Sequence, residues 1–184
     1  MKKLNRKDFI FGDQASSELV KLPGQINNNS FLCRNLVDCE VYLCDKIGTI
    51  YVDDCVGCKF YLGPVTSSIF MRSCSDCQIS VAAQQVRISD SKNITALLFS
   101  QTQTTLENVT GLVIGPYNFA YSGIEEHFVG QTLNLTHNMA FKVMDFTPSD
   151  ESWRIMRAEE FAGSHQRILP DVEQEAVNPV PIPV

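Results

Sequence analysis

Four cysteines in the first half of this 184-residue chain have the spacing of a zinc site. Cys55, Cys58, Cys74 and Cys77 satisfy the pattern C-x2-C-x15-C-x2-C. Thiolates at this spacing bind Zn²⁺ tetrahedrally in zinc ribbons, where the metal holds a small fold together. The first chemistry to consider is therefore a structural metal site.

The residues around these cysteines recur at a nearly regular interval, which explains the same spacing without a metal. The matching positions follow each other along the chain in pairs: Leu36 and Cys39, Cys55 and Cys58, Cys74 and Cys77, Ser91 and Ile94, Asn108 and Gly111. Metal ligands should not be replaced by leucine and asparagine while the flanking pattern persists. The repeat therefore favours a ladder of small inward-facing thiols over zinc, and we expect no bound metal.

Short alternating runs of apolar residues precede the repeated positions, at residues 50–52, 69–71 and 86–88. A repeat of roughly 18 residues with β-branched alternation is typical of a parallel β-solenoid. One coil cannot bury its own apolar face, so coils stack and equivalent positions form ladders. We expect a mainly β protein, a parallel β-helix of about five short coils between residues 30 and 115, with a small α or irregular C-terminal cap.

The rest of the chain is assigned to flanking segments. Residues 1–20 are interpreted as a polar N-terminal lead-in, and residues 21–150 as the β-helix domain with its end cap. The spacing of apolar residues over 151–163 predicts a C-terminal helix, with Trp153, Met156 and Phe161 on one face. Residues 164–184 are polar and end in alternating prolines, so we expect a disordered or polyproline tail.

Composition excludes several classes of function. The formal charge of −6 and the lack of a basic stripe argue against nucleic acid binding. No window of 18 apolar residues exists, so we expect no transmembrane segment, and no apolar segment of a secretory signal follows the basic start. Lys2 follows the initiator methionine, so no lipidation motif is recognised. Reduced thiols and a cytoplasmic location are the expectation.

The second chemistry to consider is an exposed arginine. Val86 and Ile88 face inward in the expected strand, so Arg87 faces outward. Counting coils places it in one outward column with Tyr51, Phe70 and Thr104. A cation beside exposed aromatic rings is typical of a binding surface, although an exposed arginine can also serve solubility alone.

Three further polar residues belong to the same neighbourhood. Gln84 and Gln85 precede Arg87 at a corner, and Glu107 lies one coil further on the same side. No glycine-rich phosphate loop, nucleophile elbow or H-E-x-x-H motif occurs, so the chain shows no nucleotide or metal chemistry of its own.

The chain resembles the C-CAP/cofactor C-like domain family over residues 7–150. The segments that carry the resemblance are KDFIF, KLPGQ, IYVDDCVGCKFYLGPV, FMRSCSDCQISVAAQQVRISD, TTLEN and DFTP. Within the family it is most similar to the X-linked retinitis pigmentosa branch, and then to tubulin cofactor C. The QQVR motif after a cysteine-containing coil is the specific feature.

The resemblance implies a right-handed parallel β-helix and GTPase-activating activity on an ADP-ribosylation-factor-like small GTPase in its GTP-bound form. It places an arginine finger on Arg87, a supporting catalytic glutamine on Gln84 and a partner contact on Glu107. Gln85, Phe70 and Tyr51 then border the partner. No cofactor belongs to this chain, because GTP and Mg²⁺ belong to the GTPase. The alternative is a non-catalytic binding module, or a cofactor C-like protein acting on tubulin.

The chain departs from the family in several places. A second arginine often follows the first after one residue, and here that position is Ser89. The acylated N-terminus and the nucleoside-diphosphate-kinase-like domain of the retinitis pigmentosa branch are not recognised, nor is the helical N-terminal region of cofactor C. The resemblance therefore implies a location at the ciliary base or cytoskeleton without identifying a membrane tether.

Overall fold

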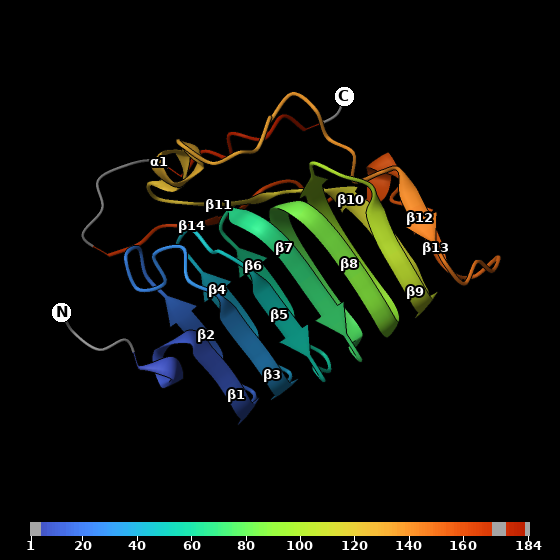
Figure 1. Cartoon of the computed structure of the whole chain (residues 1–184), viewed down its shortest axis with the longest axis horizontal. Helices are drawn as coiled ribbons and strands as arrows, with labels where there is room; N and C mark the ends of the chain where they lie inside the picture. Colours follow the sequence, from blue (N-terminus) through green and yellow to red (C-terminus); the bar gives the residue numbers. More distant parts are fainter. Residues whose placement is uncertain (1–4, 171–175, 183–184) are drawn as a thin grey trace.

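The computed structural model describes residues 5–170 and 176–182, and it is a parallel β-solenoid of about six turns (Figure 1). Its turns contribute parallel strands to two walls. The first wall comprises β1 (Ile10–Ala15), β3 (Phe31–Val37), β5 (Ile50–Asp53), β7 (Val65–Arg72), the middle of β8 (Ser75–Ser100), β9 (Thr104–Thr110) and β12 (Val143–Asp145). The second wall comprises β2 (Glu18–Lys21), β4 (Glu40–Leu43), β6 (Lys59–Leu62), both ends of β8, β10 (Leu112–Pro116) and β13 (Trp153–Ile155).

The predicted mainly β solenoid is confirmed, but it has one more turn than the sequence suggested. The extra turn is β1 and β2, which lie within and just beyond the segment predicted as a polar lead-in. β1 pairs with β3 through Ile10 and Leu32, and this step along the chain is longer than the next one, from Leu32 to Tyr51. A loop before β3, with Asn27 and Asn28 at positive φ, lengthens this turn and hides it from a search at constant period.

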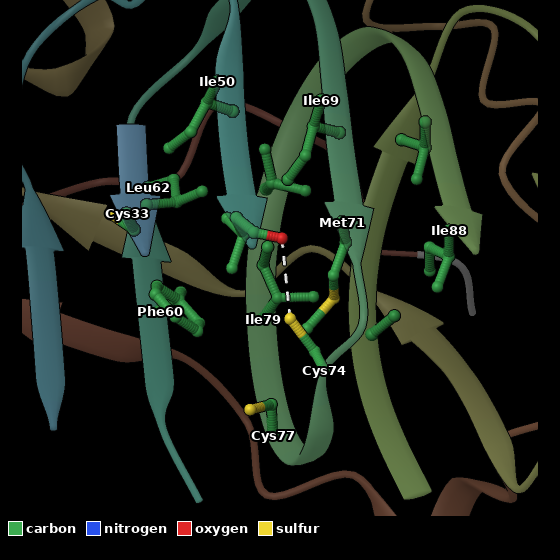
Figure 2. Packing of buried hydrophobic residues seen from close by; sticks show 14 of the residues in the cluster. Cys33, Ile50, Phe60, Leu62, Ile69, Met71, Cys74, Cys77, Ile79 and Ile88 are labelled. Atoms are coloured by element: carbon green, nitrogen blue, oxygen red, sulfur yellow. Dashed lines mark hydrogen bonds between the residues drawn. The ribbon is translucent and has the colours of Figure 1, made fainter. Parts of the chain in front are cut away.

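The cysteines lie inside the core, as predicted from the repeat (Figure 2). All seven are buried and none is in a disulfide. The thiol of Cys74 hydrogen-bonds the carbonyl oxygens of Arg72, at 3.3 Å, and Val52, at 3.5 Å. Burial raises the pKa of Cys33 well above the usual range and that of Cys44 to about 12. These neutral thiols behave as small core residues.

Two corner positions in each turn set the register of the walls. Both have positive φ, and they are occupied by Asp13 and Ser16, Asn35 and Asp38, Asp54 and Gly57, Ser73 and Asp76, Asp90 and Asn93, Asn108 and Gly111. Short Asx side chains and glycine tolerate this left-handed conformation best. The predicted equivalence of Ser91 with Asn108 is wrong by one residue, because Ser91 pairs with buried Val109 while Asn108 occupies the exposed corner.

A second layer covers the outer surface of the second wall. It is built from β11 (Phe119–Tyr121), the short helix α1 (Ile124–Phe128) and β14 (His165–Arg167), which lie along one flank of the stack in Figure 1. β14 pairs in parallel with β11, and the ring of Phe119 lies against those of Tyr42 and Tyr61 from the wall. These aromatic residues form a separate buried cluster with Leu169 and Val180.

The prediction of a disordered tail is wrong for the residues that the structure describes. Within residues 164–170 and 176–182, β14 is hydrogen-bonded to β11, and Leu169, Ala176 and Val180 are buried. Val180, between two of the prolines, and Leu169 pack into the aromatic layer, which composition alone does not reveal. Residues 171–175 and 183–184 of the predicted tail lie outside the described residues.

The helix predicted for residues 151–163 is also wrong. The segment forms β13 and a single 3-10 turn, η2 (Ala158–Glu160). β13 pairs with β10, with Trp153 opposite Leu112. The backbone groups along the free edge of β10 need partners, and this pairing outweighs a weak helical spacing of apolar residues.

Both ends of the core are covered by local structure. At the N-terminal end, Phe9 of η1 (Arg6–Phe9) and Phe11 pack against the core. At the C-terminal end, buried Ala140 and half-buried Phe141 pack on the last turn, and Thr104 donates a hydrogen bond to the carbonyl of Ala140. The C-terminal cap, predicted to be α or irregular, is formed here by irregular segments, whereas α1 lies on the flank. None of the helices in the described ranges has the length and apolar character needed to span a bilayer.

Candidate functional site

The outer surface of the first wall carries the residues that the sequence singled out. Outward side chains of successive turns form one column: Ile10, Leu32, Tyr51, Phe70, Arg87, Thr105 and Met144. We call the outward residues of the first wall the open face, because this column stays exposed or half-buried. The predicted fourth member was Thr104, and this is wrong by one residue, since Thr104 is buried and Thr105 pairs with Arg87.

Arg87 stands near the middle of the open face with its charged group free. It is exposed between Val86 and Ile88, which are both buried as predicted. Its guanidinium carbon lies 5.9 Å from the centre of the Phe70 ring, and Phe70 stacks on Tyr51 at 5.3 Å. Among the described residues Arg87 has no hydrogen-bonded or ion-paired side-chain partner. The aromatic rings can support the stem while the N–H groups stay available to a ligand.

The neighbouring Arg72 shows the opposite situation. Its guanidinium donates two hydrogen bonds to the carboxylate of Asp53, at 2.8 and 2.7 Å, and lies 5.6 Å from the Tyr51 ring centre. Hydrogen bonding to Asp53 raises the pKa of Arg72. Two arginines on adjacent strands therefore differ in what they offer, since Arg72 is already bound within the protein and Arg87 is not.

The remaining predicted residues lie around Arg87, but not all in the same way. Gln85 is held in place, because its side-chain oxygen accepts a hydrogen bond of 3.0 Å from Ser68. The half-buried Gln84 lies at the corner, where its backbone carbonyl accepts hydrogen bonds from Thr102. Its side-chain amide makes no hydrogen bond to a described residue. Glu107 is exposed and unpaired within the described part of the chain, one strand across and two residues along from Arg87, or about 8 Å.

Sequence reasoning missed other residues of the same face. Leu32 and Arg34 pair in register with Tyr51 and Asp53, and Met144 pairs with Thr105 at the other end. The residue spacing between Tyr51 and Phe70, applied once more towards the N-terminus, would have identified Leu32 and Arg34. Met144 follows a long insertion after β10, so no period could have placed it.

The described residues show no arrangement of three or more His, Cys, Asp or Glu side chains that could hold a metal ion. The chemical resources of the open face are therefore an unpaired guanidinium, an unpaired carboxylate, amides and two stacked aromatic rings. Such a set can bind an anionic group at Arg87 and a cationic group at Glu107, with apolar contact between them.

Comparison with protein families and curated proteins adds independent information. The tubulin binding cofactor C family matches residues 28–146, which include the open face around Arg87. Protein XRP2 of Danio rerio is 35% identical over 175 residues, covering 94% of this chain and 46% of that protein. Tubulin-specific chaperone C of Mus musculus is 30% identical over 165 residues, covering 90% and 46%. The chain thus spans just under half the length of these relatives.

A solved structure supports the same fold. Tubulin Binding Cofactor C from Leishmania major superposes with a TM-score of 0.58, covering 85% of this chain and 94% of that one. At 16% sequence identity this likeness concerns the fold alone.

Proposed function

The chain belongs to the tubulin binding cofactor C family, and from that premise we propose that it activates GTP hydrolysis by an ADP-ribosylation-factor-like small GTPase. The observation that carries the proposal is Arg87, an exposed and unpaired guanidinium supported by Phe70 in the middle of the open face. The resemblance of the QQVR motif to the family's arginine finger assigns it the catalytic role.

The chemistry follows from the charge that develops during phosphoryl transfer. Negative charge spreads over the oxygens of the transferred group, and a guanidinium placed there stabilises the transition state. An arginine finger supplied in trans accelerates hydrolysis by about 10³–10⁵-fold, which corresponds to roughly 4–7 kcal/mol of activation free energy. GTP and Mg²⁺ belong to the partner, and this chain contributes the finger.

The other residues have supporting roles in this proposal. The free amide of Gln84 would hold the guanidinium of Arg87 or the residue of the partner that orients water. Glu107 would pair with a basic residue of the partner, and Tyr51, Phe70 and Gln85 would border the contact. The hydrogen bond of Gln85 to Ser68 gives it a fixed orientation suited to a border position.

The decisive experiment is single-turnover hydrolysis of GTP by candidate ADP-ribosylation-factor-like GTPases, with and without this chain. Stimulation of one or a few of them by at least about 10³-fold supports the proposal. Binding to the GTP-bound form without any acceleration would contradict it and favour a non-catalytic binding module.

A second candidate partner is tubulin, and the similarity to tubulin-specific chaperone C favours it. The same open face would then dock on tubulin, whose own bound GTP would be hydrolysed. Pull-downs with GTP-locked small GTPases and with tubulin, run side by side, separate the two. A cytoplasmic location at the ciliary base or the cytoskeleton remains a prediction that imaging of the tagged protein would check.

A further inference from the structure

A hollow lies at the N-terminal end of the open face. It has a volume of about 490 Å³, and its lining includes Phe9, Ile10, Leu32 and Tyr51, with Arg6 at the side. Ile10 and Leu32 belong to the outward column described above. The hollow is therefore an apolar depression on the same surface as Arg87, and it could receive a large apolar side chain.

The hollow is continuous with the Arg87 site. Tyr51 lines it and also stacks on Phe70, which in turn supports the guanidinium of Arg87. Leu32 and Arg87 are three strand spacings apart, or about 14 Å. A stable protein interface covers about 800 Å² on each partner, so a protein docked over Arg87 must extend along the wall in at least one direction.

Two arginines lie at or near the hollow: Arg6 lines it, and Arg34 is two residues along β3 from Leu32. Within the described part of the chain, neither Arg6 nor Arg34 has an ion pair, although Arg34 lies in register with Asp53. Both oxygens of Asp53 are engaged by Arg72. Arg34 crosses the wall over Gly12, where an added Cβ would lie only 3.3 Å from its Cγ. Glycine at this position leaves room for the stem of Arg34.

We propose that this hollow and Arg34 form a second anchoring site for the same GTP-bound partner, taking a large apolar side chain flanked by carboxylates. The proposal rests on the proposed function and adds the direction in which the partner extends, from Arg87 towards the N-terminal turn. The site increases affinity, because a buried apolar side chain contributes binding free energy. It also helps to select among GTPases, because the flanking charges accelerate and orient association with a complementary partner. Arg87 alone supplies the transition-state contact.

The test uses the full chain and the GTPase whose hydrolysis it accelerates, loaded with a non-hydrolysable GTP analogue. Leu32→Gln and Arg34→Glu should each raise this Kd about tenfold or more. The rate of hydrolysis by the GTP-loaded GTPase at a saturating concentration of each variant should fall only slightly. Arg34→Glu should also weaken the salt dependence of association. Lys59→Glu makes the same change of charge on the second wall and should leave Kd within about twofold. Met144→Gln tests the opposite end of the column. Thermal unfolding of each variant confirms that it folds.

Three results would overturn the proposal in distinguishable ways. If the unmodified chain accelerates no GTPase, the proposed function fails and this inference fails with it. If acceleration is found but Arg34→Glu and Leu32→Gln bind like the unmodified chain, only the second anchoring site is wrong. A loss of binding confined to Met144→Gln would show that the partner extends in the opposite direction.

Discussion

The two outer walls of this solenoid carry the same arrangement of aromatic rings and a cation, yet the described residues cover only one of them. On the second wall Tyr42 stacks on Tyr61 at 5.0 Å, and the guanidinium carbon of Arg167 lies 4.1 Å from the Tyr42 ring centre. On the open face Phe70 stacks on Tyr51, and Arg87 lies over Phe70.

The difference lies in what binds each cation. Arg167 comes from the chain's own C-terminal layer and donates a 2.9 Å hydrogen bond to Glu18. Arg87 comes from the wall itself and has no such partner among the described residues. The first arrangement is complete within the protein and holds a layer in place. The second has no such layer among the described residues, and under the proposed function the partner would cover it.

The largest expected effect concerns Arg87. Arg87→Ala and Arg87→Lys should both abolish stimulated hydrolysis, a loss of about 10³–10⁵-fold, while Kd for the GTP-bound partner stays within about tenfold. Lysine should fail because a compact ammonium cannot reproduce the planar fork of donors. Single-turnover rates at saturation measure this. Normal stimulation of hydrolysis by the Arg87→Ala variant would show that Arg87 is an ordinary surface residue. The unpaired state of Arg87 would then have no functional meaning.

The next largest effect compares one aromatic residue from each wall. Tyr61→Ala should lower the free energy of unfolding by about 3 kcal/mol, because Tyr61 is buried against Phe119 and His165. Phe70→Ala should cost about 1 kcal/mol, since Phe70 is only half-buried. Urea unfolding of both variants gives the comparison. Equal losses would mean that the open face is as important for stability as the covered one.

A smaller effect is expected from Glu107. Glu107→Ala should raise the Kd for the partner about tenfold, or roughly 1.4 kcal/mol, because its proposed role is pairing with a basic residue. The rate at saturation should change less than the affinity. Ser89→Ala, in register on the adjacent strand, is the matched control. A variant that binds normally but hydrolyses slowly would assign Glu107 to catalysis instead.

The smallest effect concerns pH and the covered wall. Burial lowers the pKa of His165 and His127 below 6.5, so the unfolded chain binds protons more readily than the folded one. The contribution of these two groups to the free energy of unfolding should be constant above about pH 6.5 and should decrease as the pH drops below it. Around His165 lie Tyr42, Glu40, Lys59 and Arg167.

The control for this prediction removes one of the two titrating groups. His165→Gln should flatten part of the pH dependence of urea unfolding. The pKa of Glu18, lowered chiefly by its hydrogen bond with Arg167, lies below this range, so that pair should hold throughout. A rise in stability on acidification would show that protonated His165 is favoured in the folded state, contrary to its buried position.

The central turns could be predicted because their signals are local and repeat. Cys55 and Cys74 fill equivalent inward positions in neighbouring turns, so counting residues was sufficient to place Tyr51, Phe70 and Arg87 in one column. The count failed where turn length changed. The turn that begins with β1 is longer, and the step from Arg87 to Thr105 is one residue longer than the step from Phe70 to Arg87. That extra residue displaced Thr104 from the predicted column.

What the sequence determined by itself is the solenoid, its buried thiols and the outward direction of Arg87, because alternation and period act over neighbouring residues and turns. Only the tertiary structure decided which outward surface stays open. Tyr42–Tyr61 and Tyr51–Phe70 are equivalent as sequence, and the choice between them depends on where β11 and β14 fold back over the wall. That packing joins Tyr42 to His165, far apart in the chain, through a hydrogen bond that no local pattern reveals.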